Sequence, residues 1–461
     1  MTASKTPATA PPSAREAAFA VLLRAEAADA FVSVLLYRTL QRSALSSADR
    51  ALATAITLGV LRHRERLDYA LAPLLSRPLE SLPPAIRTVL RMGAFQLLEL
   101  DRIRAAAVVS ESVTLATRHG HAGTARLVNA VLRRLAADGP PAPPDPGTDP
   151  IGHLTVVHSH PRWLIARWIA RWGLEEGAAL AVANMRPAPS VLRANSLRTT
   201  PEGLIAQLHG RGIPAEAGLV PEAIRVRGSL TGRLPLYEEG LFAVQDEGSM
   251  LVSHAVEPAA GATVIDACAG AGGKTTHLAA LMRDAGRLIA ADVQPRKLAA
   301  LAERCTAMGA TCVEAHHQDA RDLGTRFAGL ADAVLVDAPC TGLGTVRRRP
   351  EIKWRAYRAG EDALARSATL QAAILAGAAG AVRPGGHLIY SVCSLEVEEG
   401  PAVVRDFLAA HPMFAPAPMP DAFPRQLGGH PVEGADAGEA WLLPHRHDVD
   451  GFYIARLRRA A

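Results

Sequence analysis

Two cysteines and one aspartate carry the clearest chemical signal in the sequence. Cys340 closes the segment Asp-Ala-Pro-Cys that begins at Asp337, and Cys393 lies in Ser-Val-Cys-Ser. Each follows a short apolar run that indicates a β-strand. An isolated cysteine is usually a small buried hydrophobe, but open α/β sheets bind their ligands at the carboxyl ends of strands. Two cysteines at such ends favour a reactive thiol pair.

A thiol beside a carboxylate suits methyl transfer to carbon-5 of a pyrimidine. That ring carbon is a poor nucleophile, but a thiolate adding at carbon-6 converts the ring into an enamine that attacks an electrophilic methyl group. A free thiol has a pKa of about 8.5, so the site must lower it or remove the proton. Asp337 is placed to hydrogen-bond the base and stabilise the adduct. An amine methyltransferase would be expected to carry an Asn/Asp-Pro-Pro-aromatic turn and would need no thiol.

A glycine-rich loop indicates where the methyl donor binds. The apolar residues 263–265 and Asp266 lead into this loop, after which a helix is expected at once. Bare backbone at a helix N-terminus can approach a ligand closely. A Walker phosphate loop would need glycine where Cys268 stands, and a dinucleotide fingerprint would need it at Thr275. The predicted cofactor loop consists of Cys268, Ala269, Gly270, Ala271, Gly272, Gly273 and Lys274.

Two further acids stand at the ends of expected strands. Asp292 is placed to accept from the two hydroxyls of a ribose, and Asp319 is placed to accept from an adenine amino group. Either could equally be a helix cap. Together with the loop they predict an adenosine site that makes little demand on phosphate, which S-adenosylmethionine fits better than NAD.

The run RRRPEIKWRAYR, residues 347–358, has six basic residues against one acid. Charge alone leaves a solvated loop and an RNA contact equally open. The run follows Cys340, and the family resemblance described below implies that it lies beside a cytosine flipped into the site. The predicted RNA-binding residues are Arg347, Arg348, Arg349 and Lys353.

The surrounding elements predict a multidomain chain. Helical spacing without strand alternation indicates an all-α first domain, and a Pro-rich stretch ends it. Short strands and turns then indicate a small α+β module, followed by strands alternating with helices, the pattern of a doubly wound, mostly parallel sheet. The predicted boundaries are a disordered tail at 1–13, the helical domain at 14–137, a linker at 138–150, the α+β module at 151–255 and the α/β domain at 256–461.

Bulk composition sets wider limits. The formal net charge of +5 is mild and only weakly favours a polyanionic partner. Five cysteines without a Cys-x-x-Cys pair indicate neither a disulfide framework nor a zinc site. No apolar stretch reaches the ~20 residues of a membrane span. We therefore expect a cytoplasmic protein that needs no membrane.

The chain resembles the RsmB (Sun) family of ribosomal RNA cytosine-5 methyltransferases from about Arg15 to Leu457. The motifs that carry the resemblance are ANSLRT, VQDEGSMLV, DACAGAGGKTTHLA, AADVQPRKL, DAPCTGLGTVRRRPEIKW, YSVCSLEVEE and HDVDGFYIARL. The sequence departs from the family at Gly270 and Ala271, where many members have Ala-Pro, and at Val392, where Thr is usual. Neither departure removes a reacting group.

The resemblance implies a function for each part. The helical domain would be a NusB-like RNA-binding domain, the α+β module would bind RNA, and the α/β domain would be a Rossmann-like methyltransferase. S-adenosylmethionine would lie along Cys268 to Lys274 and meet Asp292, Asp319 and Asp337. Cys393 would be the nucleophile and Cys340 would assist product release. The substrate would be a cytosine in 16S rRNA, and the chain is expected to act as a monomer.

Two rival functions share much of this sequence. A tRNA cytosine-5 methyltransferase would carry the same catalytic motifs, and a ribosome-assembly factor could keep the domain for binding RNA without catalysis. Asp337, Cys340 and Cys393 together argue against the second. A last group, His445, His447, Asp448 and Asp450, has the residue types of metal ligands but no metal-site spacing, so no metal is expected.

Overall fold

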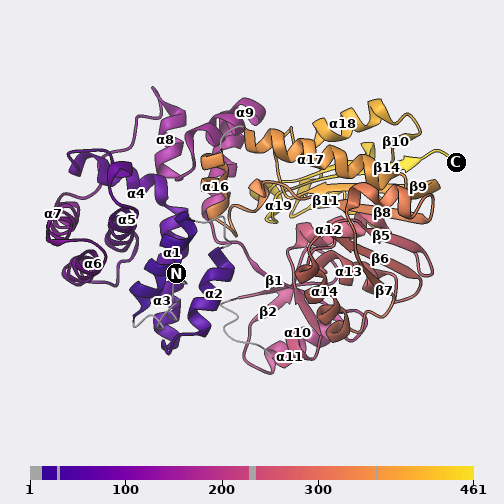
Figure 1. Cartoon of the computed structure of the whole chain (residues 1–461), viewed down its shortest axis with the longest axis horizontal. Helices are drawn as coiled ribbons and strands as arrows, with labels where there is room; N and C mark the ends of the chain where they lie inside the picture. The colour runs from indigo at the N-terminus through magenta and orange to yellow at the C-terminus, as the bar shows by residue number, and fades with distance from the viewer. Residues whose placement is uncertain (1–12, 28–31, 228–234, 360–361) are drawn as a thin grey trace, which may run out of the picture. The chain divides into compact units, whose positions relative to one another are not determined.

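The computed structural model describes residues 13–27, 32–227, 235–359 and 362–461. The predicted disordered tail lies outside this part of the chain, except for Ser13. The chain divides into two compact units (Figure 1). The first contains Met1–Met185 and Arg349–Arg358, and the second contains Arg186–Arg348 and Ala359–Ala461.

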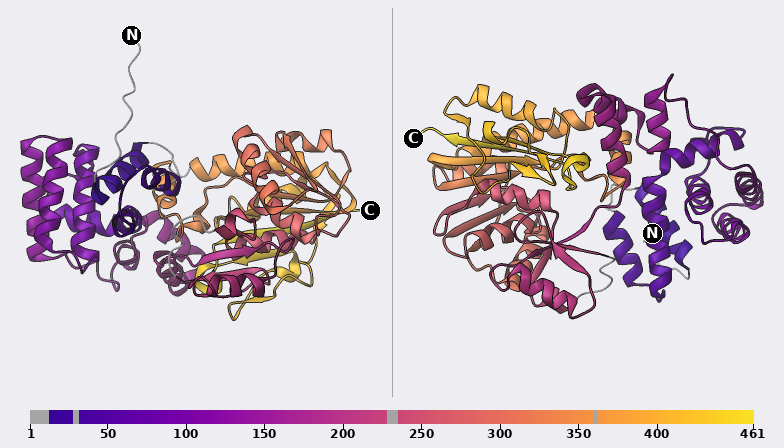
Figure 2. Two further views of the ribbon diagram at one scale, coloured as in Figure 1. Left: turned by 90° about the horizontal axis from the view of Figure 1, so that it is seen from below. Right: turned by 180° about the vertical axis from the view of Figure 1, so that it is seen from behind.

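The first unit is helical, as predicted, and Figure 2 shows its helices from two further sides. Side-chain caps begin several of them: Ser46 accepts from Asp49 N ahead of α3, and Asp149 accepts from Gly152 N ahead of α8. Its helices are α1 (Ala14–Ala27), α2 (Val32–Gln41), α3 (Ser47–Arg62), α4 (Arg64–Leu71), α5 (Pro84–Glu99), α6 (Ala105–His119), α7 (Ala122–Asp138), α8 (Pro150–Val157), α9 (Arg162–Met185) and α16 (Glu351–Ala359).

Helix α16 comes from the far end of the sequence, yet it completes the core of the helical unit. Trp354 is 3% exposed and packs in the same apolar cluster as residues of α1, α3 and α5. Its indole Nε1 donates to the carbonyl of Leu61, 2.6 Å away. Segment 349–358 therefore belongs with the helices, whereas the predicted boundaries kept it in the α/β domain.

The second unit begins with a small antiparallel sheet. Its strand order is β2-β3-β1-β4, and helix α10 (Pro201–His209) packs against it. The strands are β1 (Ser190–Ala194), β2 (Ala215–Ala217), β3 (Ala223–Val226) and β4 (Phe242–Val244), with α11 (Pro235–Glu238) before the last. It corresponds to the α+β module predicted at 151–255, except that α8 and α9, up to Met185, belong to the helical unit.

The rest of the second unit is built on an eight-stranded sheet of order β10-β14-β9-β8-β5-β6-β7, with β13 paired to β14. The central strands β9, β8, β5, β6 and β7 run parallel, and β14, β10 and β13 pair antiparallel. The bounds are β5 (Thr263–Asp266), β6 (Arg287–Asp292), β7 (Val313–His317), β8 (Ala331–Asp337), β9 (Val382–Val392), β10 (Phe414–Pro416), β13 (Glu439–Leu442) and β14 (Phe452–Arg459).

Helices cover both faces of this sheet (Figures 1 and 2). Alternate residues explain this, because Val264 and Leu335 pack in one apolar cluster while Ile265 and Val336 pack in another. One face carries α12 (Glu247–Val256), α13 (Gly273–Leu281) and α14 (Pro295–Met308), and the other carries α17 (Asp362–Ala379) and α18 (Pro401–Ala410). The remaining short elements are α15 (Leu323–Arg326), β11 (Gln426–Leu427), β12 (His430–Pro431) and α19 (Pro444–His447).

The doubly wound, mostly parallel sheet agrees with the predicted fold class. Among the helices that the structure describes, none combines the length and apolar character needed to cross a membrane.

Candidate active site

Neighbouring strands bring the two predicted cysteines together. Strands β8 and β9 pair in parallel with Asp337 opposite Ser391, so Cys340 and Cys393 follow the carboxyl ends of adjacent strands. Their Sγ atoms lie 3.4 Å apart. The amide of Gly344 donates to the carbonyl of Cys393, 3.0 Å away, and ties the two loops together. The spacing of two strand ends has thus produced a thiol pair.

A buried glutamate holds the Cys340 loop in place. Glu399 is fully buried, and its carboxylate accepts from both the amide and the hydroxyl of Thr341, at 2.8 and 2.5 Å. Gln371 donates to the same carboxylate at 3.2 Å and to the carbonyl of Pro339 at 3.0 Å. Nothing in the run Glu396-Val-Glu-Glu distinguishes this glutamate from its neighbours, so the sequence did not identify it.

The carboxylate of Asp337 is oriented from both sides. Lys274 Nζ donates to its Oδ2 at 2.7 Å, and the hydroxyl of Ser391 donates to its Oδ1 at 2.8 Å. Lys274 ends the predicted cofactor loop, so this ion pair joins that loop to the strand end that carries the cysteines. Asp337 is partly exposed and can accept a further donor from a ligand.

The ionisation of these groups follows from their surroundings. Hydrogen bonding to Cys393, together with burial, raises the pKa of Cys340 well above its ordinary value. Burial lowers the pKa of Lys274, but Asp337 outweighs it and the net shift is upward, with Cys393 also contributing. Burial and the carboxylates of Asp266 and Asp337 raise the pKa of Cys268. Cys340 and Cys268 therefore stay protonated at neutral pH, and Lys274 stays charged.

The glycine-rich loop has the conformation that its residues predict. Gly270 and Gly272 have φ values of +56° and +83°, a region that other residues rarely adopt. A side-chain carbon at Gly270 would meet nothing closer than Cys268 O at 4.0 Å. The backbone before α13 is thus bare and open at Gly270, as close approach of a ligand requires.

Asp266, at the end of β5, is a site residue that the sequence analysis did not single out. It is 1% exposed, and Thr275 Oγ1 donates to its Oδ2 at 2.8 Å, while its Oδ1 has no hydrogen-bond partner among the described residues. Burial raises its pKa to about 6. The signal that indicated Asp292, an acid ending an apolar strand before a loop, applies equally to Asp266.

The carboxylates of Asp292 and Asp319 both accept hydrogen bonds from other groups of the protein. Asp292 is 8% exposed and accepts from the amide of Gly270 at 3.0 Å and from that of Gln294 at 2.8 Å. It therefore fixes the cofactor loop. Asp319 accepts from the amide of Arg321 and pairs with its guanidinium at 2.7 Å, which lowers the pKa of Asp319. The alternative reading of Asp319 as a cap agrees with this position.

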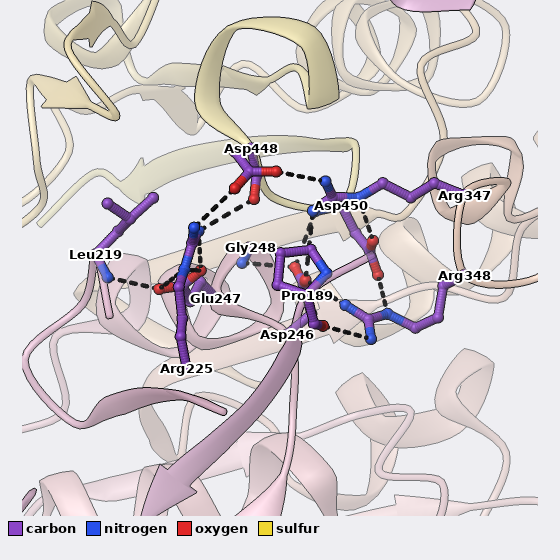
Figure 3. A network of polar contacts seen from close by, with 10 residues as sticks. All are labelled: Pro189, Leu219, Arg225, Asp246, Glu247, Gly248, Arg347, Arg348, Asp448 and Asp450. Atoms are coloured by element: carbon purple, nitrogen blue, oxygen red, sulfur yellow. Dashed lines mark hydrogen bonds and ion pairs between the residues drawn. The ribbon is translucent and has the colours of Figure 1, made fainter. Parts of the chain in front are cut away.

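The basic run is largely internal, which differs from the solvent-facing RNA contact that we predicted. Arg347 is 3% exposed, and its guanidinium donates to Asp450 and Asp448. Arg348 donates to Asp246 at 2.8 Å and to Asp450 at 2.9 Å (Figure 3). Desolvated guanidinium groups need such carboxylate partners. Asp448 and Asp450 thus serve as ion-pair partners in this network.

Lys353 is also buried, within the helical unit. It is fully inaccessible, and its Nζ donates to the carbonyls of Arg62, at 2.9 Å, and Ser159. Burial lowers its pKa well below the ordinary value. Arg349 is the one predicted RNA-binding residue with an exposed side chain.

Comparisons with known proteins agree with this architecture. Residues 253–458 match the model of the family "16S rRNA methyltransferase RsmB/F", residues 12–137 match the NusB family, and residues 160–231 match the ferredoxin-like domain of RsmF/B-like methyltransferases. The fold class predicted from the sequence is confirmed by these three matches.

Three similar proteins cover nearly the whole chain. The "Probable ribosomal RNA small subunit methyltransferase B" of Bacillus subtilis is 33% identical, over 97% of this chain and 99% of that protein. The "Ribosomal RNA small subunit methyltransferase B" of Thermus thermophilus is 36% identical, over 96% and 97%. The crystal structure of PH0851 superposes with a TM-score of 0.83 at 26% identity, covering 97% of this chain and 99% of that one.

Proposed function

Because the chain belongs to the RsmB/F family of 16S rRNA methyltransferases, we propose that it methylates carbon-5 of a cytosine in small-subunit rRNA through a covalent cysteine adduct. One observation carries the proposal. Two thiols lie 3.4 Å apart at the ends of adjacent parallel strands, beside an aspartate held by Lys274. Methyl transfer to an amine would need neither thiol.

The residues of the loop fit S-adenosylmethionine as the methyl donor. The buried Oδ1 of Asp266 has no hydrogen-bond partner among the described residues, which suits an ammonium group of a ligand, and the backbone at Gly270 is open to one. Asp292 holds that backbone in place. When bound, S-adenosylmethionine supplies a methyl group bonded to a positively charged sulfur, which is the electrophile that the reaction requires.

The side chains of this protein would have the following roles in the reaction. Cys340 remains a thiol. Cys393 acts as the nucleophile: it gives up its thiol proton to a base, and its sulfur forms a bond to carbon-6 of the cytosine. Asp337 accepts a hydrogen bond from the base and orients it. After carbon-5 has gained the methyl group it loses its proton to a base, the carbon-5 to carbon-6 double bond re-forms, and the bond from carbon-6 to Cys393 breaks. Cys340, 3.4 Å from that sulfur, assists this release.

Single cysteine variants test these roles. Cys393→Ala should abolish methylation of a 16S rRNA transcript and form no adduct. Cys340→Ala should accumulate a protein–RNA adduct that survives denaturing electrophoresis. Cys312→Ala, outside the site, is the matched control and should behave as the wild type. Normal turnover by Cys340→Ala would remove its role in release, and methylation by Cys393→Ala would refute the covalent proposal.

Bisulfite sequencing identifies the substrate. Comparing rRNA and tRNA from cells with and without this protein should show one cytosine in small-subunit rRNA that loses its protection. Loss of protection in tRNA instead would make the chain a tRNA methyltransferase. Unchanged protection in both would favour a non-catalytic role in ribosome assembly. Of the predicted RNA-binding residues, we keep only the exposed Arg349 in this proposal.

A further inference from the structure

Three side chains with metal-binding atoms meet in the second unit, outside the site described above. They are Glu222, just before β3, His254 on α12 and His277 on α13. One ligand atom from each lies within 4.8 Å of the other two. Oε1 of Glu222 is 2.9 Å from Nε2 of His254 and 2.6 Å from Nε2 of His277. No sequence pattern predicts this group, because its members are far apart in the chain and follow no metal-site spacing.

The hydrogen bonding of His277 is incomplete. Its ring is 1% exposed, Nε2 lies 2.6 Å from Oε1 of Glu222, and Nδ1 has no hydrogen-bond partner among the described residues. A buried polar group without a partner costs about 1–3 kcal/mol. A cation at the point where the three side chains meet would take up the lone pair of one nitrogen. This unsatisfied ring is an observation independent of the clustering itself.

Arg193 is the opposing charge in this region. Its guanidinium is fully buried and donates to the carbonyl of Gly273 at 2.7 Å and to Thr276 Oγ1 at 2.9 Å. A nearby positive charge weakens the binding of any cation. The ligand types decide which cation can still bind. Two of the three ligands are imidazoles, which Mg²⁺ and Ca²⁺ disfavour and Zn²⁺ prefers.

We propose that Glu222, His254 and His277 bind a divalent transition metal, Zn²⁺ in the first place. Two histidines and a carboxylate with water in the fourth position form a known tetrahedral zinc set. The side chains of His254 and Glu222 are 16% and 12% exposed, which leaves access for the water and for entry of the ion. This inference revises our expectation of a metal-free protein and does not depend on the proposed function.

The position of the group defines what the metal does. Glu222 lies in the turn that leads into β3, where its carbonyl accepts from the amide of Ala194 at 2.8 Å. His277 lies on the helix that begins at the cofactor loop. A metal bonded to both would join this turn of the small sheet to that helix. The proposed role of the metal is therefore structural, because it would stabilise the second unit.

Cobalt spectroscopy of the full-length protein tests the site. Protein stripped with a chelator and titrated with Co²⁺ should develop the visible absorption of a tetrahedral complex and saturate at one equivalent. Glu222→Gln and His254→Ala should each lose this absorption. His430→Gln removes an exposed histidine outside the group and should keep it. The proposal fails if the wild type develops no such band, or if the band persists in both variants.

Thermal unfolding gives a second readout that does not depend on coordination geometry. Adding Zn²⁺ to the stripped protein should raise the Tm of the wild type and of His430→Gln, because a ligand that binds only the folded state stabilises it. Glu222→Gln keeps the shape of the side chain and should fold, as circular dichroism will show, but its Tm should not respond. A wild-type Tm unaffected by Zn²⁺ would overturn the proposal.

Discussion

At the scale of single residues, the site consists of two thiols and of the side chains that hold their loops in place. Cys340, Cys393 and Asp337 were predictable because parallel strands place their carboxyl ends at one edge of a sheet. Glu399, which holds the Cys340 loop, was not singled out, because its contacts with Thr341 and Gln371 join segments that local patterns do not connect. Asp266 was not singled out either, although it ends an apolar strand as Asp292 does and the same local signal applies to it.

Glu399→Gln should impair release of the methylated RNA. The amide replaces one carboxylate oxygen with a donor that faces the donors of Thr341, so the Cys340 loop loses its anchor. We expect kcat to fall roughly 10- to 100-fold, the size of effect that a misplaced reacting group causes. The KM for RNA should not change, and a protein–RNA adduct should accumulate as in Cys340→Ala. Glu398→Gln is the neighbouring control. A lower kcat without adduct would assign Glu399 to general stability instead.

The stability of the protein should depend on pH through Asp266. Its pKa is about 6 in the folded protein, above the ordinary value of 3.8, so between these values the unfolded chain loses a proton that the folded one retains. The free energy of unfolding therefore falls as pH rises from about 4 to about 6. In urea unfolding, the free energy of unfolding of Asp266→Asn should rise relative to that of the wild type by on the order of 3 kcal/mol as the pH goes from 4 to 7. A difference between the two proteins that is constant with pH would contradict this assignment.

At the scale of elements, the order of strands and helices was predictable, and the ion-pair network was not. Alternating strand and helix patterns correctly predicted the doubly wound sheet. The basic run looked like an RNA-facing loop because its charge is visible in the sequence and its partners are not. Asp246 and Asp450, which bind Arg348, lie about a hundred residues away on either side.

Removing the buried carboxylate of Asp450 from this ion-pair network should destabilise the second unit. Asp450 is 3% exposed, so Asp450→Ala removes a buried carboxylate that accepts from both Arg347 and Arg348. We expect the free energy of unfolding to fall by about 3–5 kcal/mol. Asp448 bonds the same Arg347 but its side chain is 57% exposed, so Asp448→Ala should cost at most about 1 kcal/mol. Equal losses in the two variants, measured by chemical denaturation, would show that burial does not determine the cost.

At the scale of the whole chain, the two units are not consecutive in sequence. The sequence indicated continuous domains because nothing in residues 349–358 marks them as part of a distant helical core. Trp354 is the residue that settles this assignment, through its burial and its bond to the carbonyl of Leu61. The predicted α+β module, 151–255, also took in α8 and α9, which belong to the helical unit.

Trp354→Ala should loosen the helical unit. Removing a buried tryptophan typically costs about 3–5 kcal/mol, so limited proteolysis of the full-length variant should cut within residues 14–185 faster than in the wild type. A fragment of residues 1–185, which lacks α16, should show the same sensitivity. Adding a peptide of residues 347–360 should protect that fragment. A fragment that resists protease without the peptide would show that α16 is dispensable for this unit.

The late position of α16 in the sequence also affects how the helical unit folds during synthesis on the ribosome. A chain leaves the ribosome from its N-terminus, and domains generally fold in that order. Here the N-terminal helices must wait for a segment that is translated more than 150 residues after their last member, α9. During that interval, the apolar surface that Trp354 covers stays open to chaperones or to other nascent chains. The helical unit is therefore first to emerge but cannot be first to finish folding.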